Sequence, residues 1–248
     1  MVTQSVPDAP KLYSELASWF HLLSSPRDYA DEAEFARSLL TEASSAPPKT
    51  VLELGSGGGN NASHLKAHFN LTLADLSPEM LELSKKINPE CEHIQGEMKT
   101  IRLGRIFDGV FIHDAIMYMA TEDDLRLAIN TASAHCKPGG AGLFMPDVLR
   151  ETFVSLTTHG GHDSDAGDGR SIRYIEWTFD PEPLDTTYTV DFAYLLRERN
   201  GPVRVVHDTH IFGIFSRETW LRLLRDAGFD ARAVEDPWGR EVFIGKKS

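Results

Sequence analysis

One carboxylate and four glycines lie within seven residues and are suited to form a ligand site. Glu53, Gly55, Gly57 and Gly59 occupy alternate positions, a further glycine stands at 58, and the stretch 51–54 is mostly apolar. This pattern predicts a buried strand, a tight turn and the start of a helix. Because glycine has no Cβ, the backbone of such a turn can approach a ligand closely, although a plain structural bend would use the same glycines.

Polar side chains also stand at the ends of the next three predicted strands. Asp75 closes the run 71–76 and lies twenty residues after Gly55, while Glu97 and His113 follow the runs 92–95 and 107–112. The carboxyl ends of parallel strands meet at one edge of a sheet, where doubly wound folds bind their ligands. A carboxylate at Asp75 can accept both hydroxyls of a ribose, or it can be the acid that leads into the next helix.

The glycine turn departs from the dinucleotide-binding fingerprint. That fingerprint needs glycine at its first, third and sixth positions, and the sixth position counted from Gly55 is Asn60. The pattern Glu53-x-Gly55-x-Gly57-x-Gly59 instead resembles motif I of the class I S-adenosylmethionine-dependent methyltransferases. S-adenosylmethionine has no pyrophosphate to place at a helix N-terminus, and it carries a cationic amine and a sulfonium, which suit an acid such as Glu53.

This resemblance covers residues 51–145 and implies a set of cofactor contacts. Asp75 would hold the ribose, Glu97 and Met98 would hold the adenine, and His113 would line the cofactor or contact the substrate. Tyr29 follows a basic and an acidic residue as in the family, and would close over the cofactor. The cofactor-binding residues implied in this way are Tyr29, Glu53, Gly55, Ser56, Gly57, Asp75, Leu76, Met80, Glu97, Met98 and His113.

A narrower resemblance, to the bacterial N,N-dimethyltransferases of nucleotide-linked deoxysugars, runs in order along nearly the whole chain. The matching pieces are Leu12-Tyr13, Arg27-Asp28-Tyr29, Glu151-Thr152-Phe153, Asp168-Gly169-Arg170, Asp208-x-His210, Ala227-Gly228-Phe229 and Val242-Phe243-Ile244-Gly245. The resemblance implies methyl transfer to an amine nitrogen. Two segments that should border the acceptor depart from the family, namely the extra residues around Trp19 and the pair His113-Asp114, where the family has small hydroxyl residues.

An amine must be neutral to attack a methyl group, so a side chain that takes its proton or orients its lone pair is expected nearby. Tyr118 follows the fourth strand where the family has a histidine or an aromatic residue, and His210 matches a family histidine with Asp208 on the same strand face. A His–Asp pair can also be purely structural. The predicted catalytic residues are Tyr13, Tyr118 and His210, and the predicted substrate contacts are Trp19, Asp114 and Arg173. For the tryptophan, packing in the core is the alternative.

Strands that alternate with helices at this spacing predict a doubly wound, mostly parallel α/β sheet. Four segments are expected: a helical lid over 1–45, a Rossmann-like cofactor core over 46–150, an antiparallel insertion over 151–215 and a return to the core over 216–248. Helices are expected over 11–21, 30–42, 60–69, 77–87, 121–135 and 217–227, and further core strands over 142–145, 232–234 and 242–245.

The insertion is expected to hold three strands, over 172–179, 186–196 and 203–215, with a tight hairpin turn at Asn200-Gly201. The glycine-rich stretch 157–171 before them is predicted to be a mobile loop. Its residues His159, His162, Asp163 and Asp165 are of metal-binding type, but no helix or strand is expected to preorganise them. No metal site is therefore predicted.

Composition narrows the class of partner. The formal net charge of −12 argues against nucleic acid, which needs clustered Lys and Arg. Cys91 and Cys136 are too few for a disulfide framework and are expected to be buried thiols in a reducing cytoplasm. The N-terminus does not resemble a signal peptide, and no stretch approaches the roughly 18 apolar residues of a membrane span. A homodimer contact through the insertion stays open.

The sequence therefore predicts a methyltransferase that uses S-adenosylmethionine and acts on a small molecule, in the first place on an amine nitrogen. Three alternatives stay open: a small-molecule O-methyltransferase, a nicotinamide-dependent oxidoreductase on the same fold, and a non-catalytic protein that binds S-adenosylmethionine.

Overall fold

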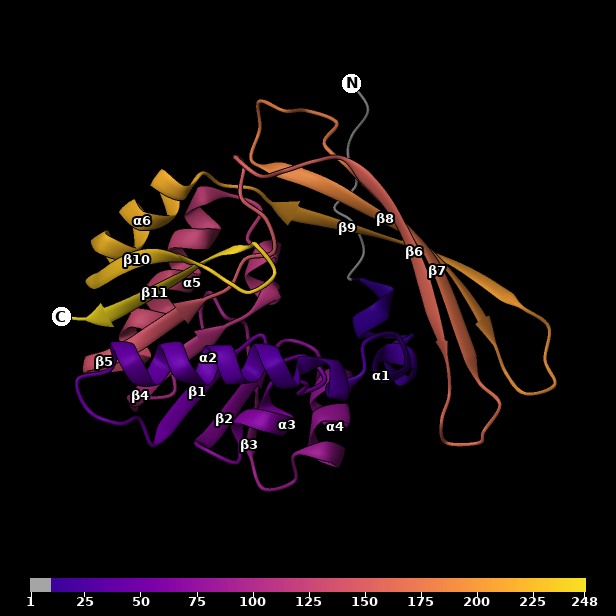
Figure 1. Ribbon diagram of the computed structural model, residues 1–248, viewed down its shortest axis with the longest axis horizontal. Coiled ribbons are helices and arrows are strands. Elements are labelled where there is room, and N and C mark those ends of the chain that lie inside the picture. Colours follow the sequence, from indigo (N-terminus) through magenta and orange to yellow (C-terminus); the bar gives the residue numbers. More distant parts are fainter. Residues whose placement is uncertain (1–9) are drawn as a thin grey trace.

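The computed structural model describes residues 10–248, and a seven-stranded sheet forms its core (Figure 1). Across the sheet the order is β3 (Glu92–Gln95), β2 (Asn70–Asp75), β1 (Thr50–Leu54), β4 (Phe107–Ile112), β5 (Cys136–Phe144), β11 (Glu241–Lys247) and β10 (Phe229–Glu235). Neighbours among β1 to β5 pair in parallel, whereas β11 runs antiparallel to β5 and β10. The predicted doubly wound, mostly parallel α/β fold is confirmed.

Helices cover both faces of this sheet because the side chains of each strand alternate between two cores. Val51 of β1 packs with α2 (Ala30–Ala43) and α3 (Ala62–Leu65), whereas Leu52 and Leu54 pack with α5 (Glu122–His135) and α6 (Arg217–Asp226). Helix α4 (Pro78–Ile87) lies beside β2 and β3. No helix within residues 10–248 is long and apolar enough to cross a membrane.

The helix that follows β2 begins where its sequence predicts. The Ser77 side chain accepts the backbone N–H of Met80, and Pro78 occupies the first helical position, where its missing N–H costs no hydrogen bond. Because of this cap, only Leu76 and Ser77 separate the end of β2 at Asp75 from the start of α4. The short connection therefore holds the Asp75 carboxylate at the carboxyl edge of the sheet.

The insertion forms a separate antiparallel sheet that extends away from the core (Figure 1). Its strands, in spatial order, are β6 (Leu156–Asp163), β7 (Ser171–Phe179), β8 (Thr187–Arg197) and β9 (Arg204–Gly213). The predicted loop over 157–171 is wrong for its first half, because β6 pairs with β7 along its whole length. Pairing with a neighbouring strand has overridden the low strand propensity of Gly160 and Gly161.

The predicted tight turn at Asn200-Gly201 is also wrong. The last paired residues of β8 and β9 are Leu196 and Arg204, so a longer connection joins these strands. Neither residue 200 nor residue 201 has the positive φ that such a two-residue turn requires. Three other bounds differ: the strand predicted over 142–145 begins earlier, as β5, the predicted helix 60–69 contains only α3, and the closing strands β10 and β11 are longer than expected.

The N-terminal segment lies between the two sheets (Figure 1). In place of one helix over 11–21 it forms η1 (Lys11–Tyr13), η2 (Ala17–Trp19) and α1 (Phe20–Leu23), followed by η3 (Pro26–Tyr29). The break comes at Ser14, whose φ and ψ of −129° and −100° lie outside the helical region. The apolar residues that predicted a helix, including Leu12 and Leu16, pack instead against the second sheet. Residues 1–9 of the predicted lid lie outside the described residues.

Candidate active site

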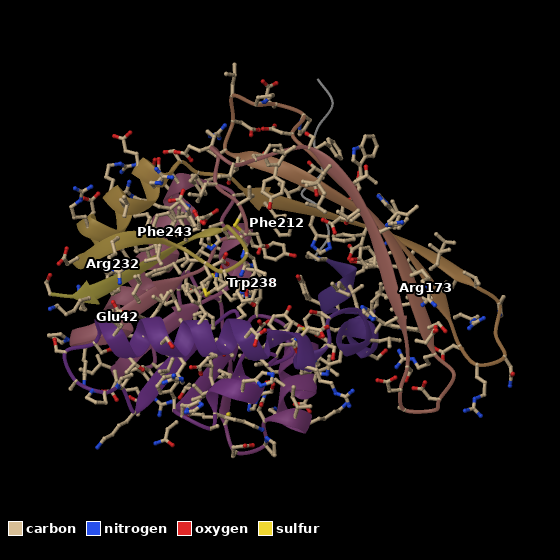
Figure 2. All side chains as sticks on the ribbon, viewed as in Figure 1. Glu42, Arg173, Phe212, Arg232, Trp238 and Phe243 are labelled. Carbon is tan, nitrogen blue, oxygen red and sulfur yellow. The ribbon has the colours of Figure 1, made fainter. Side chains whose placement is uncertain are left out.

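A cavity of about 1220 Å³ opens between the carboxyl edge of the core sheet, the N-terminal segment and the second sheet. We call the part lined by residues up to His113 the core half, and the part lined by residues from Asp114 onward the sheet half. Figure 2 shows Phe212, which belongs to the sheet half, where the second sheet meets the core. A space of this size is large enough for a cofactor and a small acceptor together.

The N-terminal segment packs directly against the glycine turn. Gly57 has a φ of 52°, in the region that favours glycine, and its N–H donates to Asp75 Oδ2 at 2.8 Å. A Cβ on Gly58 would lie 2.8 Å from the ring of Phe20 and 2.7 Å from His21, so the segment can approach only because residue 58 lacks a side chain. His21 Nε2 donates to the Gly58 carbonyl oxygen at 3.0 Å. The turn and the segment therefore form one closed wall.

Glu53 is a buried carboxyl group beside this turn, with only 2% of the residue exposed. Its Oε2 atom has no hydrogen-bond partner among the described residues, although the side chain lines the cavity. Burial, partly offset by the charge of His113, raises the pKa of Glu53 to about 8. A cation placed in the core half would pair with this carboxylate and offset the cost of its burial.

Asp75 is held in a fixed orientation at the end of β2. Its Oδ1 accepts the backbone N–H of Ser77, and its Oδ2 accepts that of Gly57, each at 2.8 Å. Burial raises the pKa of Asp75, and these two bonds oppose the rise. A carboxylate offers about four acceptor positions, so both oxygens can still accept hydroxyl groups from a ligand in the cavity.

His113, at the end of β4, lies between two carboxylates. Its Nδ1 is 3.2 Å from Asp114 Oδ1, and its Nε2 is 3.0 Å from Glu32 Oε2 on α2, the latter a charge contact without hydrogen-bond geometry. Burial lowers the pKa of His113, but the two carboxylates outweigh burial and hold that pKa well above its usual range. His113 is therefore an imidazolium at neutral pH. Arg240 contacts Glu32 on its other side and lies 3.3 Å from Asp147.

Three side chains form a hydrogen-bonded chain at the wall of the sheet half. The Tyr118 hydroxyl lies 2.6 Å from His210 Nδ1, and His210 Nε2 lies 3.2 Å from Asp208 Oδ2. Asp208 also accepts the backbone N–H groups of Lys11 and Leu12 at 3.0 and 2.9 Å. Burial raises the pKa of Asp208, but the bonds from His210 and the two backbone groups lower it more, so Asp208 is a carboxylate.

The direction of these bonds follows from Asp208, which can only accept. In the neutral form of His210 the proton lies on Nε2, facing Asp208, and Nδ1 accepts the hydroxyl proton of Tyr118. Burial holds the pKa of Tyr118 well above its usual range, so the tyrosine keeps that proton. Its oxygen lone pairs are thus left for a donor in the cavity. The Tyr118 oxygen is therefore a hydrogen-bond acceptor at the wall of the cavity.

Thirteen of the predicted site residues line the cavity, namely Tyr13, Tyr29, Glu53, Gly55, Ser56, Gly57, Asp75, Leu76, Glu97, Met98, His113, Asp114 and Tyr118. Met80 does not, because it is fully buried in the core. His210 lies behind Tyr118 and acts on the cavity only through it.

Trp19 and Arg173 also lie outside the cavity lining. Trp19 is 5% exposed and packs in the cluster between the N-terminal segment and the second sheet, with Arg170 over its ring at 3.9 Å. Core packing, the alternative for this tryptophan, is the arrangement that the structure shows. Arg173 lies far out on the second sheet, on the outer face of β7, and pairs with Asp163 (Figure 2). Arg173 therefore does not line the cavity, and its contact with a substrate stays a prediction.

Asp147 was missed in the sequence, whereas Glu176 is one of the charges of the insertion that could meet a substrate from the antiparallel sheet. Asp147 follows β5 at the same sheet edge as the other strand-end groups, and extending the strand-end rule to the fifth strand would have found it. Glu176 shares the inner face of β7 with Tyr174 and Thr178. Period-2 alternation along 171–179 separates this inner face from the outer face of Arg173. The predicted strand 172–179 already contained this alternation, but the sequence did not say which face lines the cavity.

Comparison with known proteins identifies the class of enzyme. Residues 51–140 match the family model described as a methyltransferase domain. The chain is 29% identical over 226 residues to the dTDP-3-amino-3,4,6-trideoxy-alpha-D-glucopyranose N,N-dimethyltransferase of Streptomyces venezuelae, and the alignment covers 88% of this chain and 91% of that protein. The chain is an S-adenosylmethionine-dependent methyltransferase. The predicted enzyme class and cofactor are confirmed, and the oxidoreductase and non-catalytic alternatives fall away.

Solved structures confirm the fold of the methyltransferase. The crystal structure of Streptomyces venezuelae DesVI matches with a TM-score of 0.84 at 23% identity, over 95% of this chain and 98% of that one. A second structure is that of S-adenosylmethionine-bound CalS10, an amino pentose methyltransferase from Micromonospora echinaspora, with a TM-score of 0.76 at 22% identity over 94% and 96% of the two chains. Both likenesses span the core and the second sheet.

Proposed function

We propose that this methyltransferase transfers a methyl group from S-adenosylmethionine to the nitrogen of a small amine in the sheet half of the cavity. The observation that carries the proposal is the chain Tyr118–His210–Asp208, which fixes a hydrogen-bond acceptor at the wall. The Streptomyces venezuelae relative is named as an N,N-dimethyltransferase of an amino sugar, which supports nitrogen as the accepting atom.

The core half suits the cofactor, which supplies an electrophilic methyl group on a sulfonium when bound. The unpartnered Oε2 of Glu53 would meet the ammonium group of the cofactor, and Asp75 would accept its ribose hydroxyls. Glu97 and Met98 would hold the adenine after β3, and Tyr29 would cover the cofactor from the N-terminal segment. These assignments rest on the chemistry of the side chains and on their common place in the lining.

The hydrogen-bonded chain offers a route for the proton that methylation leaves on the amine. The methylated ammonium donates an N–H to the Tyr118 oxygen, Tyr118 passes its own proton to Nδ1 of His210, and Asp208 stabilises the imidazolium that forms. The amine loses one proton and His210 gains one, so Tyr118 ends unchanged. A neutral methylamine can then accept a second methyl group.

We propose in addition that residues 1–45 act as a lid. Within the described residues, three hydrogen bonds support this role by tying the segment to the core half. His21 donates to the carbonyl oxygen of Gly58, Ser77 donates to that of Tyr13 at 2.6 Å, and Asn60 donates to that of Ser24 at 3.1 Å. Opening would be confined to the part of the segment before α2, because Ala33, Ala36 and Leu40 of α2 are buried in the core.

We propose that the outer face of the second sheet joins two copies of the chain. Ile175, Trp177 and Val205 are each more than half exposed on this face, and Leu195 lies between them in register with Val205. A twofold axis would bring this apolar face against itself. Light scattering should give twice the chain mass, and Trp177→Lys should return it to one chain mass; a monomeric parent protein would contradict the dimer.

Turnover of paired acceptors tests the main proposal. The purified protein is incubated with S-adenosylmethionine and with amines and alcohols of the same carbon skeletons, and S-adenosylhomocysteine and methylated products are measured by mass spectrometry. Methylated amines are expected. Methylation confined to the alcohols would establish an O-methyltransferase and overturn the assignment to nitrogen.

A further inference from the structure

The lining of the cavity is short of positive charge. His113 is already held by Glu32 and Asp114. The only lysine in the lining formed by residues 10–248 is Lys99, whose ammonium lies 3.1 Å from Glu97 and 3.0 Å from Asp124. No arginine belongs to that part of the lining, and residues 1–9 contain neither Lys nor Arg in their sequence.

Cations close to the lining in sequence are engaged elsewhere. The Arg150 guanidinium donates to the backbone carbonyl oxygens of Pro183 and Ile214 at 2.9 and 3.2 Å, and to that of Asp185. Lys11, which lies between the lining residues 10 and 12, directs its ammonium to the carbonyl oxygen of His207 at 2.9 Å. Both side chains hold the second sheet in place. Recruiting either cation to a ligand would break the bonds that it makes here.

Negative charge, in contrast, is abundant in the sheet half. Asp114, Asp147 and Glu176 all line it. Asp114 lies beside His113 and Asp147 beside Arg240, but Glu32 contacts both of these cations as well, so the carboxylates outnumber the cations among the described residues. About half of the Asp147 side chain is accessible, but that surface opens into the cavity, so burial, aided by Asp114, raises its pKa to about 6. Around these carboxylates the walls are mostly aromatic and apolar, including Phe192 and Phe212.

Glu176 is a charged group on an otherwise uncharged inner face of β7, which carries Ile172, Tyr174 and Thr178 beside it. Its two carboxylate oxygens accept the hydroxyls of Thr158 at 3.1 Å and Thr178 at 3.3 Å. No positively charged side chain in the described residues pairs with it among the ion pairs of the structure. A carboxylate held in place by hydroxyls alone is suited to a donor or a cation from a ligand.

A nucleotide-linked acceptor would bring a diphosphate with about two negative charges, which proteins bind with Arg or Lys. The sheet half provides carboxylates and aromatic rings instead. We propose that the acceptor of this enzyme is a phosphate-free basic amine, attracted as an ammonium by Asp114, Asp147 and Glu176. The inference rests on the proposed N-methyltransferase function and separates this enzyme from a relative whose named substrate is dTDP-linked.

The same groups give the amine a path to its reactive state. An ammonium that enters the sheet half meets the carboxylates first, and an aromatic ring such as that of Phe192 can face its charge. Its proton passes to a carboxylate oxygen, which forms one O–H bond as one N–H bond breaks. The amine is then neutral, and its remaining N–H groups can donate to Tyr118.

Two forms of one amino sugar test the proposal directly. The methyl glycoside of a 3-amino-3,6-dideoxyglucose is compared with the dTDP-linked form of the same sugar, with S-adenosylhomocysteine production as the readout. We expect kcat/KM to favour the glycoside by at least about tenfold, since like charges in a poorly solvated site exclude the diphosphate. Equal or better use of the dTDP-linked form would overturn the proposal. No turnover of either form or of any other amine would instead overturn the proposed function, and the inference with it.

Two variants locate the effect in the sheet half. Glu176→Gln should raise the KM for basic amines about tenfold and leave the affinity for S-adenosylmethionine unchanged, because it removes one charge that faces the acceptor. Glu198→Gln is the control, since Glu198 lies on an exposed connection with 66% of its side chain accessible. Equal KM values in both variants would contradict a role for Glu176.

A gain of function covers the case in which Glu176→Gln does not fold. Leu156 lies in the lining and is 43% exposed, so Leu156→Arg adds a cation to the sheet half without burying it. Use of the dTDP-linked sugar should rise roughly fivefold relative to the glycoside, the scale of one partly exposed ion pair. If the ratio does not change, the lack of cations is not what excludes the nucleotide.

Discussion

The two halves of the cavity are built in different ways. In the core half, Glu53, Asp75 and His113 lie at the carboxyl ends of strands of one parallel sheet, and backbone N–H groups hold Asp75 in place. In the sheet half, the groups come from η4 (Asp114–Tyr118), from the stretch after β5 and from inner faces of β7, β8 and β9. On the proposed assignments, cofactor recognition is tied to the core sheet, whereas acceptor recognition draws on both the ends of core strands and the inner face of the second sheet.

Charge separates the halves further. The core half contains the buried carboxyl group of Glu53, whose Oε2 has no hydrogen-bond partner among the described residues, so one added cation would pair with it. Among the described residues, the sheet half already contains more carboxylates than cations, and aromatic side chains lie around these carboxylates. A single substitution should therefore affect either cofactor binding or acceptor use, and rarely both.

The largest effect on cofactor binding is expected from Asp75→Ala. The change removes the acceptors for two ribose hydroxyls and for the N–H groups of Gly57 and Ser77. Loss of charged hydrogen bonds of this kind should raise the Kd for S-adenosylmethionine about 100-fold or more in titration calorimetry. Asp230→Ala, at an exposed position on β10, is the control and should bind normally. Unchanged binding by the Asp75 variant would separate this residue from the cofactor.

The pH dependence of cofactor binding should report on Glu53. Its pKa in the folded protein is raised to about 8 from 4.5, so the folded state holds this proton more tightly than the unfolded state. The contribution to stability is complete below pH 4.5 and is lost as the pH rises through about 8. A cofactor cation needs the carboxylate, so affinity should rise with pH, by up to about tenfold per unit below 8.

Calorimetry between pH 6 and 8, in buffers of different ionisation enthalpy, measures the proton released as Glu53 pairs with the cofactor. Glu53→Gln cannot release that proton, so its affinity should be flat over the same range. A parent protein that binds without proton release would show that Glu53 does not meet the cofactor cation.

A smaller effect, confined to the sheet half, is expected from Tyr118→Phe. The ring stays, but the acceptor held by His210 is lost, so kcat should fall about tenfold while the Kd for S-adenosylmethionine changes little. His210→Gln should give a similar fall, and the double variant no further one, because the two residues act as one unit. If the losses of kcat add in the double variant, Tyr118 and His210 act independently.

The same division explains what the sequence could predict. Alternation of apolar runs and helix caps identified the core strands, and the polar residues at their ends identified Glu53, Asp75 and His113, because a strand end fixes where a side chain lies. The strand over 172–179 was predicted, but the sequence does not say which of its faces lines the cavity, and Arg173 lies on the opposite face from Glu176. Strand β6 was missed because pairing with β7, and not its own glycine-rich sequence, stabilises it. The break of the lid at Ser14 has no local signal.

The smallest effect should come from the contact that joins the lid to the glycine turn. His21 is a neutral donor to the Gly58 carbonyl oxygen, because burial lowers its pKa. His21→Ala removes one hydrogen bond of about 1 kcal/mol, so S-adenosylmethionine should dissociate several-fold faster in stopped-flow measurements, with little change in kcat at saturation. His68→Ala, at an exposed position, is the control. If kcat falls in proportion, the lid also positions the acceptor, and the two halves are coupled more closely than their separate construction implies.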